Sequence, residues 1–346
     1  MAFNATRMLA AGALALGLGV VGLSSAASAQ DADWNKVIEE AKKEGKVSLY
    51  TSTLGAPFHL DIIKAFKAKY GITIELLDVR ASELDERVRT EQASQRYNAD
   101  VVQHGSSSLR LYQRDGKLQP RGNTPNMKTL RDALKSQADA DRTPSYILPY
   151  GILVNTDLVK PADEPKSWLD LLDPKWKGKI ISDDFRAVGG GFTWFTATDE
   201  YMGVPDFHQK LSQQGIVFSR DVGNDERRVA RGEYPLRIPQ LASNYLRMKG
   251  LPVKLIFPKE GISYVRFDLG IVKNAPHPNA AKLMIDFYLS EEAQLIYANA
   301  GMAPVINLDP KKVNEDARAM SEAKLLGTTN PDTQEAQLAK AKELYK

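Results

Sequence analysis

The sequence predicts an α/β fold made of two lobes. Strand and helix patterns alternate between Gly45 and Gly105, in the order strand, helix, strand, helix, strand. This order favours an open parallel sheet with helices on its faces. The chain has 346 residues, a length at which a single hydrophobic core has usually split into two. Because no Gly- or Ser-rich linker separates the halves, we expect strands rather than a flexible tether to join them.

The first residues of the chain have the composition of a cleavable export signal. Arg7 supplies a short basic region, an apolar stretch follows from Met8 to Leu23, and small residues end at Ala27-Ser28-Ala29. This order is typical of a secretory signal peptide, and it predicts a segment 1–29, cleavage after Ala29 and a periplasmic protein. The alternative is a membrane anchor, but the apolar run is short for a span of about 20 residues.

The composition excludes several classes of protein. Lys and Arg number 46 against 43 acidic residues, with the two signs interspersed, so no nucleic-acid surface is expected. The absence of cysteine excludes disulfides and thiolate metal sites. The motifs H-E-x-x-H, G-x-S-x-G and the P-loop are missing, and the histidines (His59, His104, His208 and His277) do not pair at metal spacing. We therefore expect no catalysis and no resident cofactor or metal.

Two amphipathic helices are expected in the first part of the mature chain. Apolar residues recur every four positions from Phe58 to Tyr70, which predicts one helical face, and Gly71 ends that helix. Ser82 is expected to cap a second helix, which reaches about Arg96. The strands expected around these helices are 47–50, 72–77 and one that starts at 101.

The rest of the chain is expected to add strands and helices of the second lobe. The segments 146–155, interrupted by Pro149 and Gly151, and 262–268 are the candidate crossovers between lobes. The tail from Lys311 onward is charged and Ala-rich, and we expect it to be helical and peripheral. The expected strands are 147–155, 179–182, 234–238, 254–257 and 265–272, and the expected helices are 127–137, one from 192, one from 278 and 290–301.

Motifs of a known family occur in order along the whole mature chain. They are Trp34 with 39–47 (EEAKKEGKV), 65–66 (AF) with 70–72 (YGI), 98–101 (NADV), 165–172 (PKSWLDLL) with 176–180 (WKGKI), 232–233 (GE), Lys273 with 277–281 (HPNAA), and 290–294 (SEEAQ). These segments resemble the ferric-binding-protein-like group of periplasmic substrate-binding proteins. The motifs are mainly structural, so they indicate the family strongly and the solute weakly.

The resemblance implies a two-lobed periplasmic-binding-protein fold, with two open mixed sheets flanked by helices and a cleft that closes around a small solute. It also implies delivery of that solute to an inner-membrane ABC permease, and we expect a monomer. Lobe 1 would comprise 30–120 with about 265–305, and lobe 2 about 121–264 with 306–346. A periplasmic enzyme on the same fold is an alternative.

The resemblance to ferric binders has one departure that bears on the solute. Ferric binders of this group carry a Tyr-Tyr pair just after the strand that follows Gly-Glu, and a histidine in the first loop. Here the pair falls near Leu241-Ala242, and the first loop reads Thr51-Ser52-Thr53-Leu54-Gly55. Fe(III) needs anionic oxygen or imidazole ligands, and Tyr245 alone does not rebuild the set. Iron binding is therefore the alternative to a small anionic organic solute.

The candidate binding residues lie in loops after strands, where open α/β sheets bind ligands. Hydroxyls, glycines and helix N-termini suit a carboxylate or phosphate, and arginines would grip it through charge-assisted bonds. Each also has a structural alternative: a helix cap, a tight turn or a surface ion pair. The predicted ligand-binding residues are Ser52, Thr53, Arg80, Gly105, Ser106, Ser107, Tyr150, Arg186, Gly189, Gly190, Gly191, Gln240, Tyr245 and Tyr264.

Overall fold

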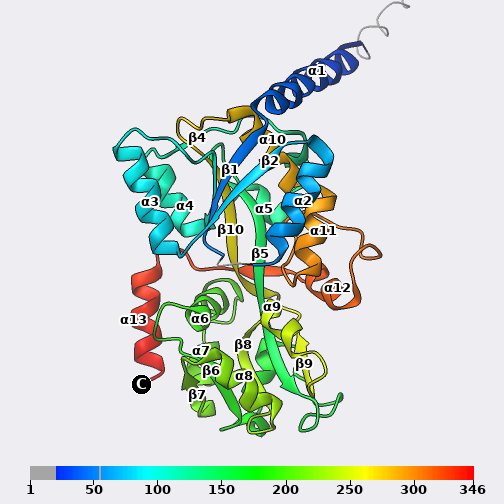
Figure 1. The fold of residues 1–346 in the computed structure, drawn as a ribbon. Coiled ribbons are helices and arrows are strands. Elements are labelled where there is room, and N and C mark those ends of the chain that lie inside the picture. The colour runs from blue at the N-terminus through cyan, green and yellow to red at the C-terminus, as the bar shows by residue number, and fades with distance from the viewer. Residues whose placement is uncertain (1–20, 54–55) are drawn as a thin grey trace, which may run out of the picture.

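The computed structural model describes residues 21–53 and 56–346 (Figure 1). Most of the predicted export signal, residues 1–20, lies outside this range, and cleavage after Ala29 stays a prediction. The described chain begins with helix α1 (Val21–Glu44), which contacts α10 (Pro278–Tyr288). Over the residues that the structure describes, we find no helix with the length and apolar character of a membrane span.

Eight of the eleven described strands form one hydrogen-bonded path in the order β2-β1-β3-β10-β5-β8-β6-β7, while β4 and β11 pair with β10 and β9 pairs with β5. The first three are parallel, as the alternating pattern predicted, and β10 and β5 are antiparallel in the middle of the path. The bounds are β1 (Lys46–Thr51), β2 (Thr73–Asp78), β3 (Val101–Gly105), β4 (Leu118–Gln119), β5 (Thr143–Asn155), β6 (Ile180–Asp183), β7 (Val217–Ser219), β8 (Leu236–Leu241), β9 (Val253–Ile256), β10 (Ile262–Val272) and β11 (Leu325–Gly327).

In the upper half of Figure 1, helices cover both faces of the sheet, with α3 and α4 on one side and α2, α10 and α11 on the other. Each side has its own apolar core, one around Phe66 and one around Leu109. The α-helices are α2 (Phe58–Tyr70), α3 (Ala81–Ala93), α4 (Ser106–Arg114), α5 (Asp132–Lys135), α6 (Gly190–Tyr201), α7 (Phe207–Leu211), α8 (Val222–Ala230), α9 (Ala242–Tyr245), α11 (Glu291–Asn299), α12 (Glu315–Glu322) and α13 (Gln334–Leu344), and the 3-10 turns are η1 (Pro125–Thr129), η2 (Trp168–Leu172), η3 (Pro174–Trp176), η4 (Ser212–Gln214) and η5 (Leu246–Met248).

The two long strands β5 and β10 connect the upper and lower halves of the molecule (Figure 1). They pair in register over this stretch, with Tyr150 opposite Ser263, Leu148 opposite Val265 and Tyr146 opposite Phe267. Both strands contain the segments that the sequence predicted as crossovers. The residue limits predicted for the two lobes stay a prediction.

The predicted helix 127–137 is wrong, because the structure divides it. η1 and the short α5 are separated by Leu130 and Arg131, whose backbone is extended. Leu130 forms a bridge with Ile306, and the Arg131 N–H donates to the Val305 carbonyl at 2.9 Å. Pairing with this distant segment replaces the local helical hydrogen bonds.

The C-terminal tail is helical, as expected, but its end is part of the core rather than peripheral. Tyr345 is buried, and its ring lies 5.0 Å from the ring of Phe185. Its hydroxyl lies 2.8 Å from Nδ1 of His208. The tail therefore contributes to the core of the lower half.

Candidate functional site

A hollow of about 610 Å³, here called the cleft, lies between segments of the two halves. The upper half of the molecule in Figure 1, from here on called lobe 1, contributes the residues after β1, the start of α2 and the end of α11. The strands β5 and β10 supply the floor. The α9–η5 segment of the lower half, from here on called lobe 2, supplies the other wall. The lining residues are Ser52, Thr53, Ala56, Pro57, Phe58, Tyr146, Leu148, Leu241, Ser243, Asn244, Leu246, Arg247, Phe267, Ala300 and Met302.

The floor of the cleft is the open face of the two long strands. Successive strand residues point to opposite faces, and only one face here is partly exposed: Leu148 and Tyr150 on β5, and Val265 and Phe267 on β10. The ring of Phe267 stacks on that of Tyr146, with centroids 4.8 Å apart and planes 12° apart. Of this face, Leu148 and Phe267 line the cleft together with Tyr146, so the floor is apolar and aromatic.

Two predicted residues, Ser52 and Thr53, line the lobe 1 wall. Thr53 donates its backbone N–H to Asp78 Oδ1 at 2.9 Å, and its hydroxyl lies 2.7 Å from Nε2 of His59. Ser52 Oγ lies 3.2 Å from Nδ1 of His104. Burial lowers the pKa of His59 to about 4 and also lowers the pKa of His104. Both imidazoles are thus neutral near pH 7, and they hold the hydroxyls without adding charge.

Ser52, His104 and Asp85 form a chain that resembles a nucleophile with its base. His104 Nε2 lies 3.4 Å from Asp85 Oδ1, but the distance is long and the nitrogen makes no hydrogen bond that meets normal geometry. The backbone N–H of Gly105 also donates to His104 Nδ1, at 2.8 Å. Because that donor already uses the Nδ1 lone pair, His104 is poorly placed to take a proton from Ser52. His104 thus positions the Ser52 hydroxyl and does not activate it as a nucleophile.

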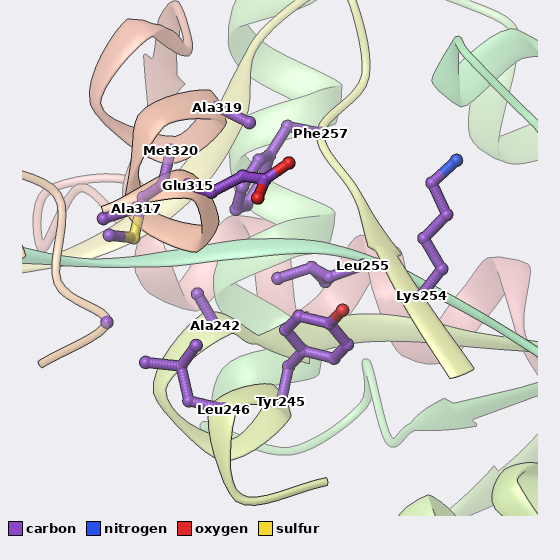
Figure 2. Close-up of a pocket in the computed structure, with 11 residues that line it drawn as sticks. Ala242, Tyr245, Leu246, Lys254, Leu255, Phe257, Glu315, Ala317, Ala319 and Met320 are labelled. Carbon is purple, nitrogen blue, oxygen red and sulfur yellow. The ribbon is translucent and has the colours of Figure 1, made fainter. Parts of the chain in front are cut away.

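The lobe 2 wall is the α9–η5 segment, whose residues point to two sides. Ser243, Asn244 and Arg247 line the cleft, while Ala242 and Tyr245 line a second pocket of about 300 Å³ that α12 closes on its far side (Figure 2). Leu246 lines both. Residues that differ by three or four positions share a helical face, so Tyr245, a predicted cleft residue, turns away from the cleft.

Arg247 supplies the charge of this wall. Among the described residues that line the cleft, it is the only charged one. It is exposed, and the described part of the chain gives its guanidinium no ion-pair partner. Asn244, beside it, donates to Glu226 Oε1 at 2.9 Å. Arg247 and Asn244 are not among the residues predicted from the sequence, although both follow the segment that carries the Tyr pair in ferric binders.

Gln240 supports the wall from behind. It is fully buried, and its side-chain amide donates to Glu226 Oε1 at 2.8 Å. Its own oxygen accepts from Arg237 Nη1 at 3.0 Å. Gln240 therefore fixes Glu226, and through it Asn244, but it does not line the cleft.

The glycine triplet at the start of α6 does not leave an open anion site. The Gly191 N–H donates to Asp183 Oδ2 at 2.6 Å, so a carboxylate of the chain already occupies the favourable position at the helix N-terminus. A Cβ on Gly190 would lie 3.0 Å from the hydroxyl of Tyr150. Burial and the nearby Asp183 raise the pKa of Tyr150 to about 12, so this phenol is neutral. Gly189, Gly190 and Gly191 serve close packing here.

The two predicted arginines do not line the cleft. Arg186 Nε donates to Asp184 Oδ1 at 2.8 Å, and Nη1 donates to the backbone oxygen of Tyr345 at 3.0 Å. Its charge is matched by a carboxylate two residues away. Arg80 is exposed at the N-cap of α3. The structure does not bring Arg80 and Arg186 together as a clamp.

The remaining predicted residues lie around the strand β10. Ser106 Oγ accepts from Arg266 Nη2 at 2.7 Å, and Ser107 is exposed on the first turn of α4. Tyr264 is buried, and its hydroxyl accepts from Gln137 at 3.4 Å. The Gly105 N–H donates to His104. Gly105, Ser106 and Tyr264 therefore have partners within the fold. Ser107 is exposed, and none of the four lines the cleft.

A family model described as bacterial extracellular solute-binding protein matches residues 98–328. The chain belongs to this family. This solute-binding protein therefore has the transport role that the sequence resemblance implied, and the mixed α/β, two-lobed fold is confirmed. Members of the family bind small solutes and work with a membrane permease, and the family is not one of enzymes.

Curated relatives are distant, and the matched part ranges from less than half of this solute-binding protein to about four fifths of it. One from Haemophilus influenzae is uncharacterised and is 30% identical, over 43% of this chain and 45% of its own length. A putative 2-aminoethylphosphonate-binding periplasmic protein of Salmonella typhimurium is 25% identical, over 75% of this chain and 77% of its own. Iron uptake protein A1 of Synechocystis is 26% identical over 80% of this chain and 79% of its own.

Solved structures agree with the fold. Ferric iron-binding protein A of Mannheimia haemolytica, in an open conformation, has a TM-score of 0.70 at 18% identity and covers 87% of this chain and 98% of its own. Apo FutA2 of Synechocystis has a TM-score of 0.69 at 20% identity, covering 87% of this chain and 99% of its own. At such identities the likeness shows the fold alone.

Proposed function

We propose that this solute-binding protein captures a small organic anion, bearing a carboxylate or a phosphate, in the cleft and delivers it unaltered to an inner-membrane ABC permease. Arg247 carries the proposal. It is the one charged group among the described residues of the lining, and no carboxylate of the described chain neutralises it. A guanidinium binds carboxylates and phosphates through paired, charge-assisted hydrogen bonds. Export through the N-terminal signal, with cleavage after Ala29, would place the protein in the periplasm.

Two solutes bound by relatives fit this lining less well. Fe(III) prefers anionic oxygen or imidazole ligands, and the described lining offers no carboxylate and no histidine, with Tyr146 as its single phenol. A polyamine, the solute in the name of a more distant Escherichia coli relative that is 28% identical over half of this chain, needs carboxylates against its ammonium groups. Inorganic phosphate would leave the apolar floor uncovered.

Native mass spectrometry of the freshly purified protein tests the proposal, because a co-purified solute shows its mass directly. We expect an organic anion, released on denaturation and bound again on titration. Ligand should also raise the melting temperature by mass action. Recovery of iron or spermidine as the tightly bound species, or chemical turnover of the solute, would refute the proposal.

Arg247→Gln is expected to weaken binding of the recovered anion about 10- to 100-fold, because a hydrogen bond to a charged group contributes about 1.5–3 kcal/mol. Calorimetric titration measures the change. Arg96→Gln is the matched control, since Arg96 is exposed and lies outside the cleft. Full affinity in Arg247→Gln would remove the support for the proposal.

Arg80→Gln and Arg186→Gln test the clamp that the sequence predicted, and unchanged affinity in both would discard that clamp.

A further inference from the structure

The polar side chains of the cleft are mostly committed to the protein itself. Besides Arg247, the described lining has five: Ser52, Thr53, Tyr146, Ser243 and Asn244. Ser52 contacts His104, Thr53 contacts His59 and Asp78, and Asn244 donates to Glu226. For the hydroxyls of Ser243 and Tyr146 the described structure gives no hydrogen bond. A polyhydroxylated solute would find few partners here, and each hydroxyl that is buried without a hydrogen bond weakens binding.

The other lining residues are apolar and come from both sides. The floor presents Leu148 and the Phe267 ring. Leu241 and Leu246 from lobe 2 and Met302 from the end of α11 add aliphatic surface. The volume of about 610 Å³ lies in the range of small-molecule pockets. Such a lining gains free energy only when an apolar surface of the solute covers it.

The floor also has a shape. Phe267 and Tyr146 stack with planes 12° apart, and Phe58 meets Tyr146 edge-on with centroids 5.6 Å apart. Strand pairing holds Tyr146 directly opposite Phe267. Because one ring lies over the other and Tyr146 is buried, the half-buried Phe267 ring leaves at most its other face for a solute. A planar aryl group can stack on a single ring face, whereas a branched group cannot.

We infer that the solute of this cleft carries its anionic group on a flat apolar body, an aryl carboxylate or aryl phosphate rather than a sugar phosphate or an amine-bearing anion. The inference rests on the proposed function, in which Arg247 holds the anionic group. It adds that the β5–β10 floor selects the body. The cleft takes the uncharged part of the solute by contact area, because most of its described lining is apolar.

Two matched sets of probes test this inference by calorimetric titration of the full mature chain. The first set shares a phosphonate and consists of phenylphosphonate, methylphosphonate and 2-aminoethylphosphonate. The second shares a carboxylate and consists of benzoate, acetate and β-alanine. In the set whose head group binds, we expect the aryl member to bind about 10- to 100-fold tighter than the other two, because it alone buries a planar apolar face.

Leu148→Asn makes the floor polar and is expected to reduce the advantage of the aryl member at least tenfold, with little effect on the smaller anions. Leu158→Asn is the control, because Leu158 is 52% exposed and outside the cleft. Thermal melting of each unliganded variant shows whether it is folded. If Leu148→Asn is unfolded, the comparison of the six probes on the unmodified protein decides alone.

The outcomes separate this inference from the proposed function. If an alkyl or amine-bearing anion binds as tightly as the aryl anion, and does so through Arg247, the anion proposal stands and the inference of an aryl body is wrong. If none of the six anions binds while Fe(III) or spermidine does, or if no probe of any kind binds, both are wrong.

Discussion

Gly191→Ala is expected to lower the free energy of unfolding by about 3 kcal/mol, the range of overpacked core positions. A Cβ at this position would lie 2.5 Å from the carbonyl oxygen of Asp183 and 2.8 Å from its carbonyl carbon. These are backbone atoms of the end of β6, which cannot rotate aside. The substitution would therefore push α6 away from β6 and weaken the bond between the Gly191 N–H and Asp183. Urea unfolding measures the loss.

Gly105→Ala is the matched control for this prediction. Gly105 also stands at the junction of a strand and a helix, but a Cβ there would meet no heavy atom within 4 Å, and its φ of −51° suits any residue. We expect a change of less than about 0.5 kcal/mol. Equal unfolding midpoints for the two variants would contradict the close packing at Gly191.

Acidification from pH 6.5 to pH 4 is expected to remove about 3 kcal/mol of stability for each of two buried histidines. Burial lowers the pKa of His59 to about 4 and that of His208 to about 3. The unfolded chain, with a histidine pKa near 6.5, binds these protons first. Between pH 6.5 and pH 4 the unfolded state thus holds more protons than the folded state, and the free energy of unfolding falls as the pH falls.

The pH dependence can be assigned to these residues by comparing slopes. His208 lies 2.8 Å from both the Thr198 hydroxyl and the Tyr345 hydroxyl, so a His59→Gln, His208→Gln double variant is less stable at every pH. Its free energy of unfolding should nevertheless fall less steeply between pH 6.5 and pH 4, because neither glutamine titrates. Parallel pH profiles for the variant and the unmodified protein, followed by urea unfolding, would show that other groups set the acid sensitivity.

Regular local patterns predicted the fold well. The four-residue period from Phe58 to Tyr70 became α2, and Gly71 ends it in the left-handed conformation with a φ of 75°. The prediction failed at 127–137, where Leu130 and Arg131 pair with the distant segment around Ile306. A periodic pattern reports which side of a segment is apolar, but it does not report which remote segment will compete for its backbone hydrogen bonds.

The candidate site was predicted only in part, for a related reason. Ser52 and Thr53 line the cleft because they follow the carboxyl end of β1, and open α/β sheets bind ligands at the carboxyl ends of their strands. The alternation of strands and helices in the sequence already implied this position. Arg186 and Arg247 could not be ranked from the sequence, since both are single cations among many. In the fold Arg186 pairs with Asp184, whereas Arg247 faces the cleft without an acidic neighbour in its lining.

The sequence alone determined the family, the order of strands and helices, and the two strands that join the halves, because these depend on residue types close together along the chain. Only the tertiary structure decided which polar groups remain available to a solute. Three polar groups contact partners that are distant in sequence or separated by a turn. The N-terminus of α6 is bonded to Asp183, Ser52 contacts His104, and Asn244 is bonded to Glu226. Electrostatic and hydrogen-bond partners are chosen by distance in space, and that distance is set only when the chain folds.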